Sequence, residues 1–153
     1  MIKGIWVKGN ENILDALEIR KKVFIDEQGV DKNIELDDKD SSCYHLIVYD
    51  KDIPVGTCRL LIGDHNYLIG RVAVIKEYRG QAFGDFIMKM AIRKSFDMGA
   101  KEVIVHAQLS VKEFYNKLGF SEFGITYNEA DIPHINMKRT QDVGGCCNCS
   151  VPS

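Results

Sequence analysis

Apolar residues recur along the chain with two periods, and each period predicts one kind of element. Weak alternation over residues 2–8 predicts an edge strand, and apolar positions at helical spacing predict a helix over about residues 11–24. Gly29 is expected to end that region. Three apolar β-type runs follow, with turn residues between them, at residues 43–50, 53–62 and 67–75. Their close spacing predicts an antiparallel meander.

The period returns to that of a helix after Gly80. The pattern there predicts a helix over residues 83–98, a strand over 101–107, a short helix over 111–118, and strands over 120–127 and 135–139. A strand, a helix and a strand around Gly80 require a crossover connection and therefore some parallel pairing. We predict an α/β fold, a mixed sheet with helices on its faces, as one domain over residues 1–140. Residues 141–153 show no periodicity and are predicted to be a disordered tail.

Composition narrows the class of function. The 153 residues include 20 Lys and Arg against 22 Asp and Glu, a net charge of −2. This balance argues against a nucleic-acid partner, because phosphate neutralisation needs a basic excess or stripe. No apolar run approaches the ~18 residues that span a bilayer, and the N-terminus lacks a signal-peptide pattern. We therefore expect a cytoplasmic protein with no membrane partner.

The five cysteines do not indicate a disulfide framework, because their number is odd and no secretion signal precedes them. Cys43 and Cys58 stand in apolar stretches and are expected to be buried. Three more cysteines crowd the tail, at Cys146, Cys147 and Cys149. Three close thiols could hold a soft metal, but a tail without metal is the favoured interpretation, and no metal is expected.

The segment from Arg71 to Asp85 carries the most chemical information. An apolar strand ends there in a basic turn that contains glycine, and an amphipathic helix begins. The unpaired N–H groups and partial positive charge of a helix N-terminus favour an anion. Gly80 and Gly84 would let a phosphate approach the backbone, and Arg79 adds a charged donor. The alternative is an ordinary loop with capping glycines.

This turn resembles a known signature. Arg79-Gly80-Gln81-Ala82-Phe83-Gly84, after Val72-Ala73-Val74, is similar to the acetyl-coenzyme A signature of the GNAT-type N-acetyltransferases. Ala82 departs from it, since glycine is usual there; alanine would fit if that residue has helical dihedral angles. Phe114-Tyr115-Asn116-Lys117-Leu118-Gly119-Phe120 matches a second family segment. Further matches resemble the small bacterial ElaA-like branch, at Arg20–Gly29, Gly70–Val74, His106–Gln108 and Ile132–Met137.

The resemblance implies the GNAT fold, with a splayed strand pair, and acetyl-CoA as cosubstrate. The backbone of Val72, Ala73 and Val74 would pair with the pantetheine arm, and the Val74 N–H would stabilise the oxyanion. The turn residues that would hold the diphosphate are Arg79, Gly80, Gln81, Ala82, Phe83 and Gly84. Tyr115 would protonate the leaving thiolate, because a phenol keeps its proton at neutral pH; the alternative is a packing role alone.

The general base stays open among three residues, Glu27, His106 and His134. Glu27 ends the first predicted helix, in a part of this fold that lines the acceptor site. His106 lies near the C-terminal end of a strand, where α/β sheets bind ligands, and His134 follows Pro133. A lone histidine is more often a structural hydrogen bonder than a base.

The acidic residues Glu35, Asp37, Asp38 and Asp40 are interpreted as a solvated surface loop. If that loop bordered the acceptor site, it would attract cationic amines. We predict an N-acetyltransferase that moves an acetyl group from acetyl-CoA to a primary amine in a ternary complex. The alternative is a non-catalytic acyl-CoA sensor with the same fold. Pairing of strand edges would allow a homodimer.

Overall fold

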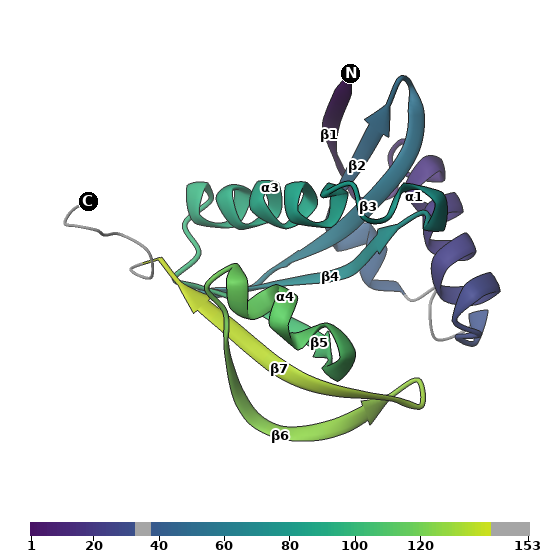
Figure 1. Cartoon of the computed structure of the whole chain (residues 1–153). Coiled ribbons are helices and arrows are strands. Elements are labelled where there is room, and N and C mark those ends of the chain that lie inside the picture. The colour runs from purple at the N-terminus through teal and green to yellow at the C-terminus, as the bar shows by residue number, and fades with distance from the viewer. Residues whose placement is uncertain (33–37, 142–153) are drawn as a thin grey trace. The chain divides into compact units, whose positions relative to one another are not determined.

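The computed structural model describes residues 1–32 and 38–141, and these fall into two compact units. The N-terminal unit comprises Met1–Ile62 and Ile69–Ala91, and the C-terminal unit comprises Gly63–Leu68 and the chain from Ile92 onward. Figure 1 shows the course of the chain through both units. The tail predicted from residue 141 lies outside the described residues from 142 onward.

The predicted meander is confirmed in the N-terminal unit. Its strands follow the order β1-β2-β3-β4, with antiparallel pairing of β1 with β2 and of β2 with β3. Their bounds are β1 Ile2–Lys8, β2 Tyr44–Asp50, β3 Ile53–Ile62 and β4 Asn66–Val74. Lys51 and Asp52 both have positive φ, 51° and 68°, between β2 and β3. Two such residues form the tight turn that the right-handed twist of a hairpin favours.

The first helical region differs from its prediction over residues 11–24. Helix α1 spans Leu14–Arg20 and continues without a break into the π-helical segment η1, Lys21–Glu27. The start is later because Asn12 has a positive φ of 56° and breaks the helical path. In η1 the Gln28 N–H donates to the Val23 carbonyl, five residues back. This wider turn carries the helical region on to Glu27, and Gly29, at φ 74°, follows it as expected.

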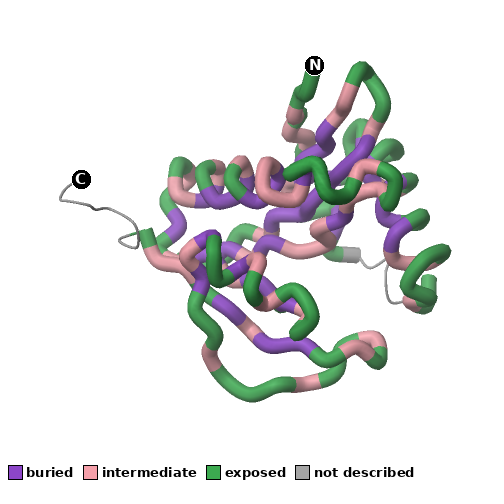
Figure 2. Tube along the Cα trace, in the orientation of Figure 1, coloured by how far each residue is buried: buried purple, intermediate pink, exposed green. Residues whose placement is uncertain are grey.

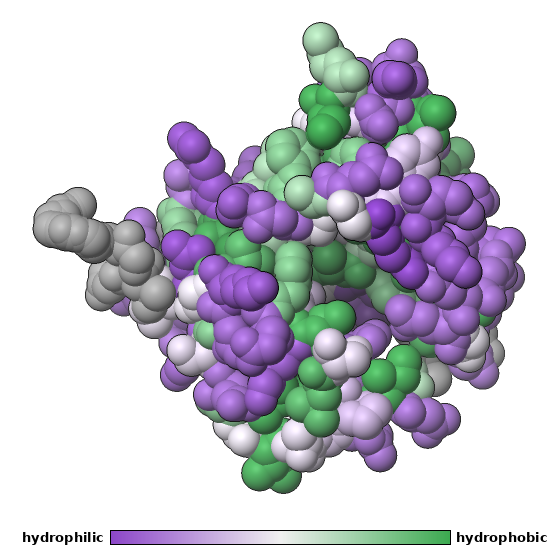
Figure 3. All heavy atoms as spheres, in the orientation of Figure 1, coloured by the Kyte–Doolittle hydropathy of each residue, from purple (hydrophilic) through white to green (hydrophobic). Residues whose placement is uncertain are grey.

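Apolar side chains from α1 and η1 pack onto one face of the N-terminal strands. Ala16, Ile19 and Val23 are buried against Ile47 of β2 and Ala73 of β4. Hydrophilic side chains cover the outer surface of this helical region (Figure 3). Leu46 of β2 lies on the opposite face, because successive side chains of a strand alternate between faces.

Helix α3, Phe83–Asp97, packs on that opposite face with the side chains of its first half. A Cβ added to Gly4 would lie 2.8 Å from Met90 Sδ and 3.3 Å from a methyl group of Leu46. A Cβ at Gly56 would lie 2.6 Å from the Ile87 methyl group and 3.3 Å from the Ala73 carbonyl oxygen. Glycine at both positions therefore lets α3 approach the strands closely.

The C-terminal unit contains three strands in the order β5-β7-β6, both pairs antiparallel. Their bounds are β5 Glu102–Gln108, β6 Ser121–Glu129 and β7 Ile132–Thr140, and helix α4 spans Lys112–Lys117 after the short turn η4, Leu109–Val111. The elements predicted over residues 101–139 are thus present, with bounds shifted by up to three residues. Most residues of β2 and β3 are buried or half-buried, whereas β6 is exposed over most of its length (Figure 2). Within the described residues, the helices are too short or too polar for a membrane span.

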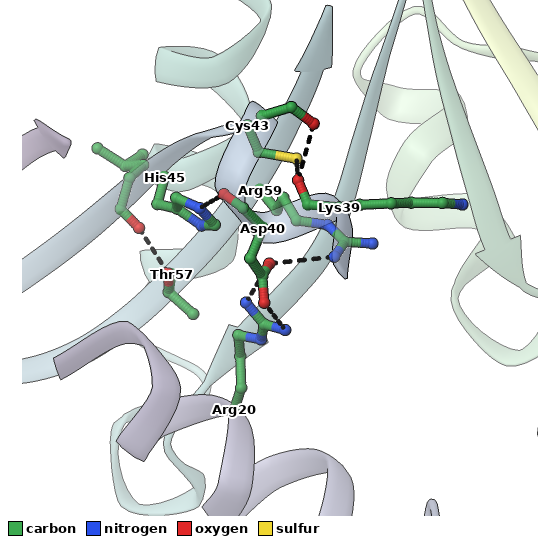
Figure 4. Close-up of polar contacts among 9 residues, drawn as sticks. Arg20, Lys39, Asp40, Cys43, His45, Thr57 and Arg59 are labelled. Carbon is green, nitrogen blue, oxygen red and sulfur yellow. Dashed lines mark hydrogen bonds and ion pairs between the residues drawn. The ribbon is translucent and has the colours of Figure 1, made fainter. Parts of the chain in front are cut away.

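Asp40 corrects the interpretation of the acidic loop as solvated surface. Its side chain is only 8% exposed and lies in the turn η2, Asp38–Ser42. Arg20 of α1 donates two hydrogen bonds to its carboxylate, at 2.9 and 3.1 Å, and Arg59 of β3 donates a third at 3.1 Å (Figure 4). Burial acts to raise the pKa of Asp40, but the hydrogen bonds and charges of Arg20 and Arg59 outweigh it and lower the pKa.

The same turn is held through its backbone. His45 of β2, also buried, donates its Nε2–H to the Asp40 carbonyl at 3.0 Å, since a backbone carbonyl only accepts. The Cys43 thiol donates to the Lys39 carbonyl (Figure 4). Cys43 and Cys58 are both buried, as predicted. The Asp40 cluster, which is Arg20, Asp40 and Arg59, therefore fixes the η2 turn on the strands.

Candidate active site

The predicted phosphate turn joins β4 to α3 through the short helical turn η3, Lys76–Tyr78. Gly80 has φ 82°, and a Cβ there would meet nothing within 4 Å, so its backbone faces open space. The first turn of α3 forms when the Phe86 N–H donates to the Ala82 carbonyl, at 3.1 Å. The N–H groups of residues 83–85 precede this bond and have no partner inside the helix. The turn therefore has the backbone needed to hold a diphosphate.

Ala82 does not have the helical dihedral angles under which alanine would fit the signature without strain. Its φ is 67°, in the left-handed region where a Cβ is unfavourable. The position thus has the backbone of a glycine and the side chain of an alanine. Phe83, the next residue, is buried and packs edge-on against Tyr78, with ring centroids 6.0 Å apart. This contact holds the start of α3 in place.

Arg79 and Glu27 meet at this turn. The two terminal nitrogens of Arg79 each donate to one Glu27 oxygen, both at 2.6 Å, and its Nε donates to the Val74 carbonyl at 3.0 Å. The pair is half-exposed, with 40% of the Arg79 side chain and 34% of the Glu27 side chain accessible. The hydrogen bonds from Arg79 lower the pKa of Glu27 despite its partial burial. Two predicted site residues are therefore brought together, one as the partner of the other.

The strand before the turn is irregular where the signature begins. Arg71 has φ 51° inside β4, a dihedral angle typical of a bulge. Beyond it, Ala73 is buried, whereas Val72 and Val74 are half-buried. The Ile75 N–H donates to the Val55 carbonyl of β3 at 2.9 Å, which ties the end of this segment to the neighbouring strand.

A second group of site residues lies on one face of the C-terminal strands. His106 of β5 stands opposite Asn136 of β7, and His134 of β7 stands opposite Tyr127 of β6. Glu129, two residues after Tyr127, shares its face. His106 Nδ1 lies 3.8 Å from one Glu129 oxygen, and His134 Nε2 lies 3.9 Å from the other. One carboxylate therefore faces both predicted histidines.

The two histidines differ in their surroundings. His134 is 7% exposed; its Nδ1 lies 2.6 Å from the Ile132 carbonyl and must carry the proton of that bond, and its ring stacks on Tyr127. The Tyr127 hydroxyl donates to the Asn136 side-chain oxygen at 2.5 Å. His106 is 39% exposed and meets the Tyr127 ring edge-on. His134 is thus locked in place, whereas His106 is open to solvent.

Sequence reasoning missed Glu129, Tyr127 and Asn136. Tyr127 and Glu129 join His134 through the pairing of β6 with β7, which a tight turn at Ala130 and Asp131 closes. Asn136 stands opposite His106 through the pairing of β5 with β7. Both turn residues have positive φ, 52° and 62°. Reading Ala130-Asp131 as a two-residue hairpin turn would have placed Glu129 and His134 on one face.

Tyr115 lies on α4 and is 8% exposed. Its ring packs edge-on against Phe114 and Phe120, with centroids 5.1 and 5.9 Å away. This aromatic packing agrees with the packing role and holds the phenol in one orientation, so it does not exclude an acid role. In the described part of the chain, no group of three or more histidine, cysteine or acidic residues is arranged to hold a metal ion.

The chain resembles known proteins over most of its length. A model of the GNAT acetyltransferase domain matches residues 11–141. The N-acetyltransferase YjcF of Bacillus subtilis is 32% identical over 139 residues, which cover 90% of this chain and 99% of YjcF. The crystal structure of an N-acetyltransferase from Lactobacillus plantarum superimposes with a TM-score of 0.84 at 29% identity, covering 91% of this chain and 97% of that one. Escherichia coli ElaA gives a TM-score of 0.79 at 27% identity, covering 90% and 99%.

These matches confirm the predicted α/β class, the GNAT fold and the likeness to ElaA. The fold is one that binds acyl-CoA together with an acceptor substrate. The matched residues include the phosphate turn, Tyr115, His106 and His134. The chain therefore belongs to the GNAT family of acetyltransferases.

Proposed function

We propose that this protein is an N-acetyltransferase that moves the acetyl group of acetyl-CoA to a primary amine by direct attack in a ternary complex. The observation that carries the proposal is the turn from Arg79 to Gly84. Left-handed backbone at Gly80 and Ala82 leads into the N-terminus of α3, whose unpaired N–H groups suit a diphosphate. Val72 and Val74 are half-buried residues, and their backbone groups would pair with the pantetheine arm.

We propose His106 as the general base and Glu129 as the carboxylate that orients it. His106 is the more exposed of the two histidines, so an amine can reach its ring. A carboxylate near Nδ1 favours the proton there and leaves Nε2 as the acceptor. The 3.8 Å separation exceeds a hydrogen bond, and contacts of this kind tighten when substrate binds. His134 is the second candidate, because its Nδ1 proton leaves Nε2 unprotonated in the neutral ring.

The amine nitrogen forms a bond to the acetyl carbonyl carbon, His106 takes one amine proton, and the carbonyl oxygen becomes an oxyanion. The resemblance to the family implies that the Val74 N–H would stabilise this oxyanion. The carbon–sulfur bond breaks, and the thiolate takes its proton from Tyr115. A phenol of ordinary pKa near ~10 can protonate a thiolate whose conjugate acid has a pKa near ~8.5.

The test combines binding with turnover. Calorimetric titration with acetyl-CoA, with ATP and NAD as controls, measures donor selectivity, and mass spectrometry then follows acetylation of a panel of cationic and neutral amines. Tyr115→Phe is expected to lower kcat about a hundredfold with little change in acetyl-CoA affinity. The matched control Tyr44→Phe, on β2, is expected to keep kcat within about twofold. Unchanged kcat in Tyr115→Phe would remove the acid role.

The histidines are separated by pH–rate profiles. His106→Gln is expected to abolish the acidic limb of kcat/KM, whereas His134→Gln should lower kcat but keep that limb. The reverse result would make His134 the base. Selective acetyl-CoA binding without acetylation of any amine would favour a non-catalytic acyl-CoA sensor, which the strained Ala82 also suits.

A further inference from the structure

The Arg79 side chain joins three segments of the N-terminal unit. Its Nε–H reaches the Val74 carbonyl at the end of β4, and its forked end reaches Glu27 at the end of η1. Arg79 itself begins the phosphate turn, so strand, turn and helical region meet at one guanidinium group. A bidentate contact fixes the plane of that group as well as its position.

The neighbouring charges favour this arrangement. Lys76 lies close enough to lower the pKa of Glu27 further, after the larger effect of Arg79. Glu77 likewise raises the pKa of Arg79, after the larger effect of Glu27. Both partners are therefore charged at neutral pH, and both oxygens of Glu27 are occupied by hydrogen bonds. A carboxylate in this state is a poor proton acceptor for an amine.

We propose that Glu27 is a positioning residue for the acyl-CoA turn rather than the catalytic base. By holding Arg79 against Val74, it sets the backbone of residues 80–84 in the shape that presents their N–H groups to a diphosphate. The inference rests on the proposed function for the identity of that ligand. It assigns diphosphate binding to the backbone and gives the forked end of Arg79 an internal role.

The experiment compares Glu27→Gln, Arg79→Gln and the double variant. Calorimetry with coenzyme A gives Kd, and acetylation kinetics give KM and kcat. The control is Asp26→Asn, because Asp26 is the preceding residue and forms an exposed ion pair with Lys21 at 3.3 Å. Arg79→Lys, which keeps the charge but loses the fork, tests whether geometry or charge matters.

We expect Kd and KM for the coenzyme to rise about fivefold in both single variants and no further in the double variant, because the two residues act as one unit. The kcat value and its pH profile should stay unchanged in Glu27→Gln, and Asp26→Asn should match the wild type. Arg79→Lys should resemble Arg79→Gln. A loss of the acidic limb of kcat in Glu27→Gln would overturn the proposal and make Glu27 the base.

Tighter coenzyme binding in Glu27→Gln would also overturn it, because Glu27 would then compete with the diphosphate for Arg79. Hydrogen exchange of the backbone amides of residues 80–85 gives a readout that needs no ligand. Glu27→Gln should speed that exchange several-fold, and unchanged exchange would contradict the clamp. Failure of the wild type to bind coenzyme A would instead overturn the proposed function, while the exchange result would still decide whether Glu27 shapes the turn.

Discussion

Two carboxylates in the N-terminal unit receive a forked guanidinium group, and they differ mainly in burial. In the Asp40 cluster, the side chains of Arg20, Asp40 and Arg59 are 1%, 8% and 6% exposed. At the phosphate turn, Glu27 and Arg79 are 34% and 40% exposed. The contacts have similar geometry, but charges removed from water interact far more strongly than charges beside it. The first contact should therefore stabilise the fold, and the second should mainly shape the turn.

Loss of the Asp40 charge should lower the free energy of unfolding more than any other substitution considered. Asp40→Asn removes the charge that compensates two buried guanidinium groups, and breaking a buried pair costs about 3–5 kcal/mol of the free energy of unfolding. Urea denaturation monitored by circular dichroism measures it. Asp97→Asn is the matched control, because Asp97 forms an exposed pair with Arg93; it should change stability by less than about 0.5 kcal/mol. A loss at Asp40 no larger than at Asp97 would contradict the assigned difference.

The same cluster should appear in the acid stability of the protein. The folded pKa of Asp40 is lowered below its ordinary value of 3.8, so its stabilisation is complete above that value and is lost as pH falls through the folded pKa. Below pH 3.8 the unfolded chain binds a proton that the folded chain does not. The wild type should therefore lose up to about 1.4 kcal/mol per pH unit from this group, and Asp40→Asn should lose none of it. Parallel stability curves of the two proteins below pH 4 would count against the lowered pKa.

Ala82 tests the backbone conformation of the phosphate turn. Ala82→Gly should raise the free energy of unfolding by about 0.5–1 kcal/mol, because the left-handed conformation is unfavourable for a residue with a Cβ. Glycine also loses more backbone entropy than alanine on folding, and this loss offsets part of the gain. Ala130→Gly is the control, since Ala130 has a similar φ of 52° in the turn between β6 and β7. Both variants should gain stability, and only Ala82→Gly should alter coenzyme affinity. Destabilisation by glycine at residue 82 would mean that the turn needs the alanine side chain.

Periodicity predicted most of the fold because core positions repeat regularly. Residues 53–62 form an apolar run bounded by turn residues, which predicted one strand, and β3 has those bounds. The predicted start of α1 was wrong because the N-cap residue, Ile13, makes no side-chain capping hydrogen bond that could mark the start in the sequence. The π-helical widening of η1 also escaped prediction, since helical spacing in the sequence does not separate one helix type from another.

The candidate site was predictable only where its residues lie close together in sequence. The phosphate turn occupies one short segment, so its motif could be read directly. Asp40 lies 20 residues from Arg20 and 19 residues from Arg59. An acidic residue in a loop is predicted to be exposed to solvent as long as such distant partners are unknown. Glu129 likewise depends on strand pairing. The roles of Tyr115, His106, His134 and the turn residues stay predictions that the variants above test.

The smallest expected effect separates the two carboxylates most directly. Glu27→Gln should lower the free energy of unfolding by less than about 1 kcal/mol, because solvent screens a half-exposed pair. Repeating the denaturation at ~1 M salt, where the Debye length falls to about 3 Å, should shrink that loss, whereas the loss in Asp40→Asn should persist. Asp26→Asn supplies the baseline for an exposed carboxylate in the same segment. If Glu27→Gln cost as much stability as Asp40→Asn at both salt concentrations, the contact with Arg79 would be a second structural cluster. Any weakening of coenzyme binding would then follow from a loosened fold rather than from the shape of the turn.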